Sequence, residues 1–222
     1  MGRLIATTPA ATIRQVTVSP MDNNVYLLTS TASGQRILID AADDPAAIMS
    51  MIAESAQDGP AGVASALDLV VTTHRHADHL GALADIVRRT GARTAAGRDD
   101  AASIEAQTGV AADVLVGQGD TIGVEGLELT VIALRGHTPG SIALAHTEPG
   151  RPAHLFTGDS LFPGGVGNTQ GDPRRFASLL DDVTARIFDV YEDDAVVLPG
   201  HGAPTTLGAE RPHLAEWRAR GW

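Results

Sequence analysis

Short apolar runs that contain β-branched residues predict buried strands along the chain. The runs at 25–30 and 35–40 are separated by Ser33 and Gly34, which favour a turn, so we expect a β-hairpin there. The run LDLVVTT at 67–73 is apolar almost throughout, as expected for a strand that is buried on both faces. Further strands are predicted at 113–116, 127–134, 141–146, 154–159 and 195–200.

Apolar positions at helical spacing predict three helices between these strands, at 44–55, 79–91 and 172–190. Asp44 and Pro45 suit the N-cap and the first residue of the first helix. Gly91 suits the C-cap of the second helix, which is expected to begin at His79 and Leu80. This mixture of strands and helices predicts β-sheets that are covered by helices.

Composition narrows the classes of protein to consider. The 222 residues, of which 43% are hydrophobic, are enough for one domain that spans residues 1–222. The net charge of −11 and the lack of a basic run argue against nucleic acid as a partner. No window approaches the roughly 18 apolar residues of a membrane-spanning helix. The sequence contains no cysteine, which excludes thiolate ligands. The first residues do not resemble a signal peptide, so we expect a cytoplasmic protein.

Histidine and aspartate residues gather directly after predicted strands. They are His74, His76, Asp78 and His79 in TTHRHADHLG, His137 in RGHTPGS, Asp159 in FTGDSLF and His201 in LPGHG. Loops at strand ends can point side chains into a shared cleft, so these seven groups can converge. Imidazole and carboxylate groups suit zinc, iron or manganese, and seven ligands are too many for one tetrahedral ion. The pattern predicts two divalent metal ions, zinc first, with iron or manganese as alternatives.

Two neighbouring cations are typical of a hydrolytic centre. Ions about 3.5 to 4 Å apart can share a carboxylate and a hydroxide, lower the pKa of that hydroxide, and stabilise the oxyanion that forms when it attacks a carbonyl. Alternate residues of an extended loop point the same way, so His74 and His76 can reach one ion while Asp78 and His79 turn toward the other.

The motifs carry a resemblance to a known family. HRHADH matches the His-x-His-x-Asp-His signature of the metallo-β-lactamase fold, and GHTPGS, TGDSLF and LPGHG resemble its later metal motifs, in the same order. The resemblance extends from about residue 20 to residue 210 and implies an αββα sandwich of two mixed β-sheets flanked by helices. It implies the following ligands: His74, His76 and His137 on the first metal, Asp78, His79 and His201 on the second, and Asp159 bridging them.

Within that superfamily the motifs most resemble the glyoxalase II-like thioesterases and the related persulfide dioxygenases. That branch usually carries Gly-Gly-Cys-Gly-Arg after the bridging aspartate, whereas this chain has Gly-Gly-Val-Gly-Asn at 164–168. Only 21 residues follow His201, so we expect no helical C-terminal domain for binding glutathione. Both departures argue against a glutathione thioester as the substrate.

Other branches of the superfamily fit the sequence less well. A true β-lactamase is expected to carry an export signal, and the class with a cysteine in its zinc site is excluded by composition. Nuclease branches need a basic surface. Lactonases that cleave acyl-homoserine lactones use a tyrosine near the metals, and neither Tyr26 nor Tyr191 is placed for that role by the motifs.

The leading hypothesis is a metal-dependent hydrolase that acts on a small ester or thioester through a metal-bridging hydroxide. Asp78 is expected to act both as a ligand and as the hydrogen-bond partner or proton acceptor of that hydroxide. The glycine-rich loop at 162–172 follows Asp159 directly, which suggests a pocket wall or lid. Phe162 and Asn168 are its candidate substrate contacts.

Two other functions stay open at this point. His74, His137 and Asp159 can form the two-histidine, one-carboxylate iron site of a persulfide dioxygenase. A metal-binding scaffold without turnover is the third possibility, and the oligomeric state is left open by the sequence.

The remaining histidines and the end of the chain are interpreted as structural. His146, His154 and His213 match no motif, so we assign them no metal. The segment at 209–222 contains two tryptophans, Trp217 and Trp222, which are expected to pack on the surface of the same domain.

Overall fold

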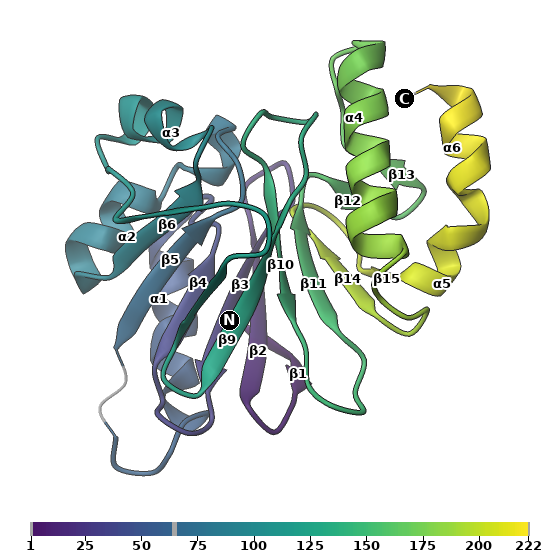
Figure 1. Cartoon of the computed structure of the whole chain (residues 1–222). Coiled ribbons are helices and arrows are strands. Elements are labelled where there is room, and N and C mark those ends of the chain that lie inside the picture. The colour runs from purple at the N-terminus through teal and green to yellow at the C-terminus, as the bar shows by residue number, and fades with distance from the viewer. Residues whose placement is uncertain (1, 64–65, 222) are drawn as a thin grey trace.

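Two mixed β-sheets lie face to face in the computed structural model, which describes residues 2–63 and 66–221 (Figure 1). The first sheet has the strand order β1-β2-β3-β4-β5-β6-β7, and its bounds are β1 Arg3–Thr7, β2 Ala11–Val18, β3 Asn23–Ser30, β4 Arg36–Ile39, β5 Leu67–Thr72, β6 Arg93–Gly97 and β7 Val114–Val116. Strands β1 to β4 pair antiparallel, and β4 to β7 pair parallel.

The second sheet has the strand order β15-β14-β11-β10-β9-β8. Its bounds are β8 Thr121–Val124, β9 Leu127–Ala133, β10 Ile142–His146, β11 His154–Gly158, β14 Val196–Pro199 and β15 Thr205–Thr206. Strands β11 and β14 are parallel, and the other neighbours are antiparallel. The short strands β12 (Leu161–Phe162) and β13 (Gly165–Val166) form a separate hairpin in the glycine-rich loop.

Helices cover the outer face of each sheet (Figure 1). Those on the first sheet are α1 (Pro45–Glu54), α2 (Leu83–Thr90) and α3 (Ala101–Thr108), and those on the second are α4 (Pro173–Val183), α5 (Leu207–Glu210) and α6 (Leu214–Arg220). The predicted αββα sandwich of two mixed sheets flanked by helices is therefore confirmed. None of the described helices combines the length and the apolar character that crossing a membrane requires.

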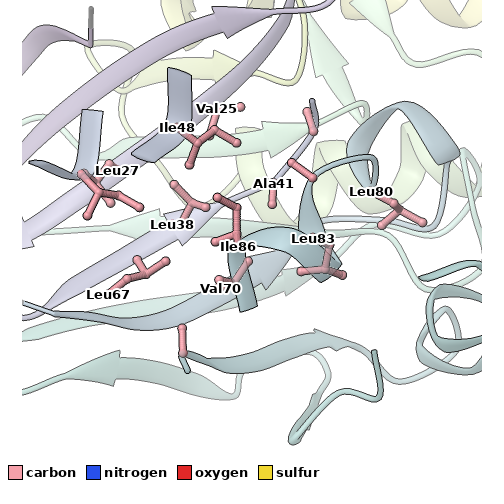
Figure 2. Packing of buried hydrophobic residues seen from close by; sticks show 14 of the residues in the cluster. Val25, Leu27, Leu38, Ala41, Ile48, Leu67, Val70, Leu80, Leu83 and Ile86 are labelled. Atoms are coloured by element: carbon pink, nitrogen blue, oxygen red, sulfur yellow. The ribbon is translucent and has the colours of Figure 1, made fainter. Parts of the chain in front are cut away.

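Hydrophobic side chains fill each space between the layers. Between the sheets, residues such as Ile37, Leu129 and Phe156 are fully buried. Figure 2 shows the space between the first sheet and α1 and α2, where Leu38 and Ile48 pack together. Alternate residues of a strand point to opposite faces, so Ile37 and Leu38 belong to different layers. Burial on both faces holds the strand ends rigid, and the histidine loops begin at those ends.

Trp217 attaches the C-terminal helices to the second sheet. Its side chain is 1% exposed, and its ring lies edge-on to Phe188 with centroids 6.2 Å apart, so the expected packing on the same domain is confirmed for this tryptophan. Trp222 lies outside the described residues.

We expect Trp217→Ala to lower the free energy of unfolding by about 3 kcal/mol, since a large buried ring is lost. Urea denaturation of the variant and the wild type measures this difference in the free energy of unfolding. Val190→Ala, at a site that is 61% exposed, is the control and should cost under about 0.5 kcal/mol.

Most of the predicted strands and two of the three predicted helices are present at nearly their expected positions. The hairpin of β3 and β4 is confirmed, as are the N-cap at Asp44 and the C-cap at Gly91. The third helix continues past α4 as a π-helical turn to Phe188. The predicted start of the second helix at His79 and Leu80 is wrong, because Ala77–His79 is a separate 3-10 turn and α2 begins only at Leu83.

A tertiary contact explains this late helix start. The amide of Ala82 donates to Ala41 O at 3.0 Å, so it makes no bond within the helix. Gly81 lies so close to the same segment that an added Cβ would be 2.6 Å from Ala42 O. The chain therefore crosses the end of β4 before it becomes helical, and the histidine loop keeps an irregular backbone.

A candidate metal centre at the strand ends

The seven candidate ligands lie together at one edge of the sandwich. His74, His76, Asp78 and His79 follow β5, His137 lies between β9 and β10, Asp159 follows β11 and His201 follows β14. The side chains of His74 and His79 are 1% and 0% exposed, while that of His201 remains 19% exposed. The predicted convergence of loops is therefore present, with one side of the cluster open to solvent.

Three imidazoles form the first group. The ligand atoms of His74, His76 and His137 all lie within 4.8 Å of one another. The Nε2 atoms of His74 and His137 are 3.3 Å apart, and the ring of His76 lies 4.5 Å from that of His137, centroid to centroid. Three histidines at such distances can hold one metal ion.

Asp78, His79 and His201 form the second group. The Nε2 atoms of His79 and His201 are 3.2 Å apart, and Asp78 Oδ2 lies 3.3 Å from the first and 3.2 Å from the second. Their ligand atoms also lie within 4.8 Å of one another. This group has the composition and spacing for a second ion.

Asp159 lies between the two groups and faces both. Its Oδ2 is 3.6 Å from His137 Nε2, and its Oδ1 is 3.4 Å from His79 Nε2. Oδ1 is buried and has no hydrogen-bond partner among the described residues, which is costly for a carboxylate unless a cation neutralises it. Gly200 makes room for this oxygen, because an added Cβ there would lie 2.4 Å from it.

Each of four imidazoles is held by a partner at its Nδ1 atom. His137 Nδ1 lies 2.8 Å from Asn168 O, His201 Nδ1 lies 2.8 Å from Met21 O, and His79 Nδ1 lies 2.9 Å from Asp40 Oδ2. His74 Nδ1 lies 3.0 Å from Thr73 Oγ1. These oxygens accept the Nδ1 hydrogens, so the Nε2 lone pairs point inward.

This arrangement of acceptors fits metal ions. Two Nε2 lone pairs 3.2 to 3.3 Å apart repel each other unless a cation lies between them and further groups. A hydrogen bond from the other ring nitrogen to a carboxylate or carbonyl is the usual support of a metal-bound histidine. Together with the unpartnered oxygen of Asp159, the donor set fits two divalent cations.

The electrostatics of the site favour the metal-binding forms of His74, His137 and the two carboxylates. Burial opposes protonation of His79, but Asp159 and Asp40 outweigh it and raise the pKa of His79, and Asp159 raises the pKa of His201, so a cation has to displace protons from these two imidazoles. Burial lowers the pKa of His74 well below its usual range, and burial likewise lowers the pKa of His137, so both imidazoles are neutral near pH 7. Burial opposes ionisation of Asp159, but the neighbouring imidazoles of His201 and His79 outweigh it and hold its pKa below the usual range. The neighbouring imidazole of His79 lowers the pKa of Asp78. Neutral imidazoles and ionised carboxylates are the forms that bind metals.

Three supporting residues were not identified by the sequence analysis. Buried Asp40 accepts from the backbone N–H and the hydroxyl of Thr73, both at 2.7 Å, as well as from His79. Asp100 is fully buried and accepts from the amides of Arg75 and Gly140, which ties the two histidine loops together. The only sequence signal for either residue is a carboxylate at the end of a strand, at Ile39–Asp40 and in GRDD.

Asn23 is the third of these supporting residues. Its side chain is fully buried, and Nδ2 donates to Asp78 Oδ2 at 3.0 Å. Ser19 Oγ donates in turn to Asn23 Oδ1 at 2.5 Å. Asn23 begins β3, and its polar side chain in the run NNVYLL is the available sequence signal.

The glycine-rich loop contacts the candidate ligands. The ring of Phe162 lies 6.5 Å from that of His201, centroid to centroid. Asn168 contributes its carbonyl to His137, while its side-chain oxygen accepts from the amide of Gln170 at 2.7 Å. Gly167 packs against the backbone of Asp159, since an added Cβ would lie 1.7 Å from its carbonyl oxygen.

The other histidines lie away from this cluster. His146 and His154 face each other across β10 and β11, and the ring of His146 is hydrogen-bonded to Thr8 and Glu148. His213 is on the surface beside Glu216. None of the three belongs to a metal-holding group among the described residues.

Comparisons with known proteins agree with this geometry. The family model described as "Metallo-beta-lactamase superfamily" matches residues 18–201. Hydroxyacylglutathione hydrolases from Chromohalobacter salexigens and Anaeromyxobacter dehalogenans are 32% and 35% identical over 181 and 182 residues, each covering 81% of this chain. The chain spans 62% and 61% of the length of these relatives.

Solved structures give the same relationship. ETHE1 from Myxococcus xanthus is 28% identical with a TM-score of 0.76, and the match covers 93% of this chain and 84% of that one. TTHA1623, solved in a di-iron-bound form, is 30% identical with a TM-score of 0.68, and the match covers 89% of this chain and 96% of that one. The family model, the relatives and the fold together show that this chain belongs to the metallo-β-lactamase superfamily and resembles its glyoxalase II-like branch.

Proposed function

We propose that the protein is a binuclear metallohydrolase that cleaves a small ester or thioester. The observation that carries this proposal is the unpartnered, buried oxygen of Asp159, which lies between two groups of inward-facing ligand atoms. His74, His76 and His137 would hold one cation, Asp78, His79 and His201 the other, and Asp159 would contact both. Zinc fits this donor set, as do iron and manganese.

When bound, the two cations supply a hydroxide nucleophile at neutral pH and polarise the substrate carbonyl. Asp78 would be a ligand of the second cation and the hydrogen-bond partner or proton acceptor of the hydroxide, and its lowered pKa keeps it ionised near pH 7. Asn23 fixes the orientation of Asp78 through the bond to Oδ2. In the net reaction the bond from the carbonyl carbon to sulfur or oxygen breaks, water adds its hydroxyl to carbon, and its proton goes to the leaving group.

Two features support a thioester among the possible substrates. The curated relatives are hydroxyacylglutathione hydrolases, whose name describes hydrolysis of a glutathione conjugate. Phe162 lies beside His201 and offers an apolar contact for an acyl group, and we place Asn168 at the opposite end of the same loop wall as a polar contact. We propose that residues 1–222 act as a single domain on a small molecule.

A second candidate function uses part of the same centre. His74, His137 and Asp159 form a two-histidine, one-carboxylate set, with Asp159 Oδ2 4.0 Å from His74 Nε2 and 3.6 Å from His137 Nε2. Such a set suits a single iron with open positions for oxygen and a persulfide. The second group, Asp78, His79 and His201, has no ligand role in that reaction, which favours the hydrolase.

Metal content distinguishes the two functions. For the hydrolase we expect two equivalents of metal per chain by elemental analysis of protein purified without chelator or metal resin, and hydrolysis of at least one thioester or ester from a panel. A single equivalent of iron together with oxygen uptake on adding a low-molecular-weight persulfide would overturn the hydrolase in favour of the dioxygenase. Bound metal without either activity would indicate a scaffold.

A further inference from the structure

The hairpin of β12 and β13 is held at its turn by the two C-terminal helices (Figure 1). Phe162 pairs with Gly165, so a tight turn that contains Gly164 lies between them. The backbone N–H of Gly164 donates to Glu210 Oε2 of α5 at 2.8 Å. Arg220 Nη2 of α6 donates to the carbonyl oxygen of Gly164 at 3.0 Å. Both backbone polar groups of this turn glycine are therefore bound by the C-terminal segment.

Glu210 is a buried carboxylate, and each of its oxygens accepts a hydrogen bond. Its residue is 6% exposed. Oε2 accepts from the amide of Gly164, and Oε1 accepts from Thr205 Oγ1 at 2.7 Å. Burial of a carboxylate is costly unless its oxygens are hydrogen-bonded, so these two donors fix its position. Thr205 begins β15, which follows His201 in the chain, and Glu210 therefore connects the hairpin turn to the segment after a candidate metal ligand.

The C-terminal helices and the base of the hairpin have apolar anchors of their own. Leu207 of α5 and Trp217 of α6 are buried in the apolar cluster on the outer face of the second sheet. Leu161, at the base of the hairpin, is buried in the same cluster. Gly164, at the turn, is exposed and has no side chain, so polar contacts alone can hold it. Glu210 thus acts at the one end of the hairpin that the apolar anchors do not reach.

The position of the turn decides where the ring of Phe162 lies. Strands β12 and β13 have two residues each, and so short a hairpin does not hold its shape without outside support. Phe162 immediately precedes the turn, and its ring lies 6.5 Å from that of His201, centroid to centroid. Release of the turn from α5 would therefore move this ring relative to the candidate metal ligands.

We propose that Glu210 is a positioning residue that sets the acyl selectivity of the metal centre by holding the turn of the β12–β13 hairpin. This inference rests on the proposed hydrolase function and deepens it, since it assigns the residue that fixes the acyl side of the site. Glu210 touches neither the substrate nor the metals in this role. With the turn held, Phe162 buries apolar carbon of the acyl group, and this contact favours longer acyl groups over acetyl.

Hydrogen exchange of the hairpin tests the hold on the turn without any turnover. Mass spectrometry follows exchange of the peptide that spans residues 161–166 in the metal-loaded protein. We expect Glu210→Ala to accelerate this exchange by about 5-fold or more, since a hydrogen bond to a charged acceptor is lost. Glu210→Gln should exchange as the wild type does, because the amide oxygen can accept from Gly164 N–H while the NH₂ group donates to Thr205 Oγ1.

Acyl selectivity is measured as the ratio of kcat/KM for the butyryl and acetyl thioesters of N-acetylcysteamine, a ratio that does not depend on the amount of active enzyme. We expect the wild type to prefer butyryl by about 5- to 10-fold, as partial burial of two methylenes gives. Phe162→Ala and Glu210→Ala should each bring the two kcat/KM values close together. The double variant should show no further change, because Glu210 acts through Phe162. Glu210→Gln should keep the wild-type ratio.

Glu148→Ala is the matched control. Glu148 also accepts a backbone N–H, that of Ala10 at 2.9 Å, and contacts the side chain of His146, but it lies outside the two ligand groups. This variant should change neither the hairpin exchange nor the acyl ratio.

Four results would each overturn the inference: wild-type exchange in Glu210→Ala, a wild-type acyl ratio in Glu210→Ala, a wild type without acyl preference, or a further change of the ratio in the double variant. Absent hydrolysis of both thioesters by the wild type would count against the proposed function instead. Hairpin exchange in Glu210→Ala would then still decide whether Glu210 holds the turn, so the two failures are separable.

Discussion

Asp159→Ala is expected to lower the metal content to one equivalent or less per chain and to reduce kcat/KM by roughly 10³-fold or more. Asp159 is the carboxylate that faces both ligand groups, with His137 Nε2 at 3.6 Å and His79 Nε2 at 3.4 Å. Without it, the first group of three imidazoles has no carboxylate, and the second group keeps only that of Asp78, so the negative charge shared by the two cations is lost. Elemental analysis of the purified variant measures the metal loss independently of any substrate.

The fold should survive this substitution. Asp159 Oδ1 makes no hydrogen bond within residues 2–63 and 66–221, so removal of the side chain breaks few contacts there. A circular dichroism spectrum like that of the wild type separates a site defect from misfolding. Asp181→Ala is the control, because Asp181 is an exposed carboxylate that pairs with Arg218 and lies in α4, outside the two ligand groups; it should retain both metals. Full metal content in Asp159→Ala would remove Asp159 from the proposed ligand set.

The candidate ligands could be predicted from the sequence because each follows a strand whose pattern is strongly apolar. Burial on both faces fixes β5, β11 and β14, and the residues after them have little freedom to lie elsewhere. The residues that orient the ligands could not be predicted in this way. Asp40 meets His79 across 39 positions of sequence, and nothing in the run ILIDA distinguishes it from an ordinary loop aspartate.

The pattern of apolar positions did not predict strand β2 or helix α3, and each omission has its own physical reason. Strand β2 contains Arg14, which reads as polar, yet its guanidinium is buried against Asp58 by two hydrogen bonds of 2.5 and 2.8 Å. Helix α3 has Ile104 as its one large buried apolar residue and shows little amphipathic pattern. In both cases a tertiary contact supplies what the local sequence lacks.

Asp40→Asn is expected to remove the second metal while leaving the fold largely intact. Asp40 accepts three hydrogen bonds, from Thr73 N, from Thr73 Oγ1 and from His79 Nδ1. If the amide oxygen of asparagine keeps the bond to Thr73 N, its NH₂ group faces His79 Nδ1. His79 must then accept at Nδ1 and carry its hydrogen on Nε2, which takes away the lone pair that faces His201 and Asp78.

Asparagine is the informative replacement because residue 40 has a φ of 56°, a left-handed conformation that asparagine tolerates and alanine does not. We expect Asp40→Asn to bind one equivalent of metal with an affinity that is about 10- to 100-fold weaker, which is the usual effect of removing a carboxylate that supports a metal-bound histidine. Competition with a chelator measures this affinity. The first equivalent should bind as in the wild type.

Asp68→Asn is the matched control for this change. Asp68 also accepts a backbone N–H, that of Arg36 at 3.0 Å, and a side-chain donor, Gln35 Nε2 at 3.2 Å, and neither partner is a histidine. Asp68→Asn should bind both equivalents of metal with the affinity of the wild type, even if its free energy of unfolding falls as much as that of Asp40→Asn. Equal weakening of metal binding in the two variants would show that Asp40 acts through general stability, and unchanged binding in Asp40→Asn would show that the tautomer of His79 does not depend on it.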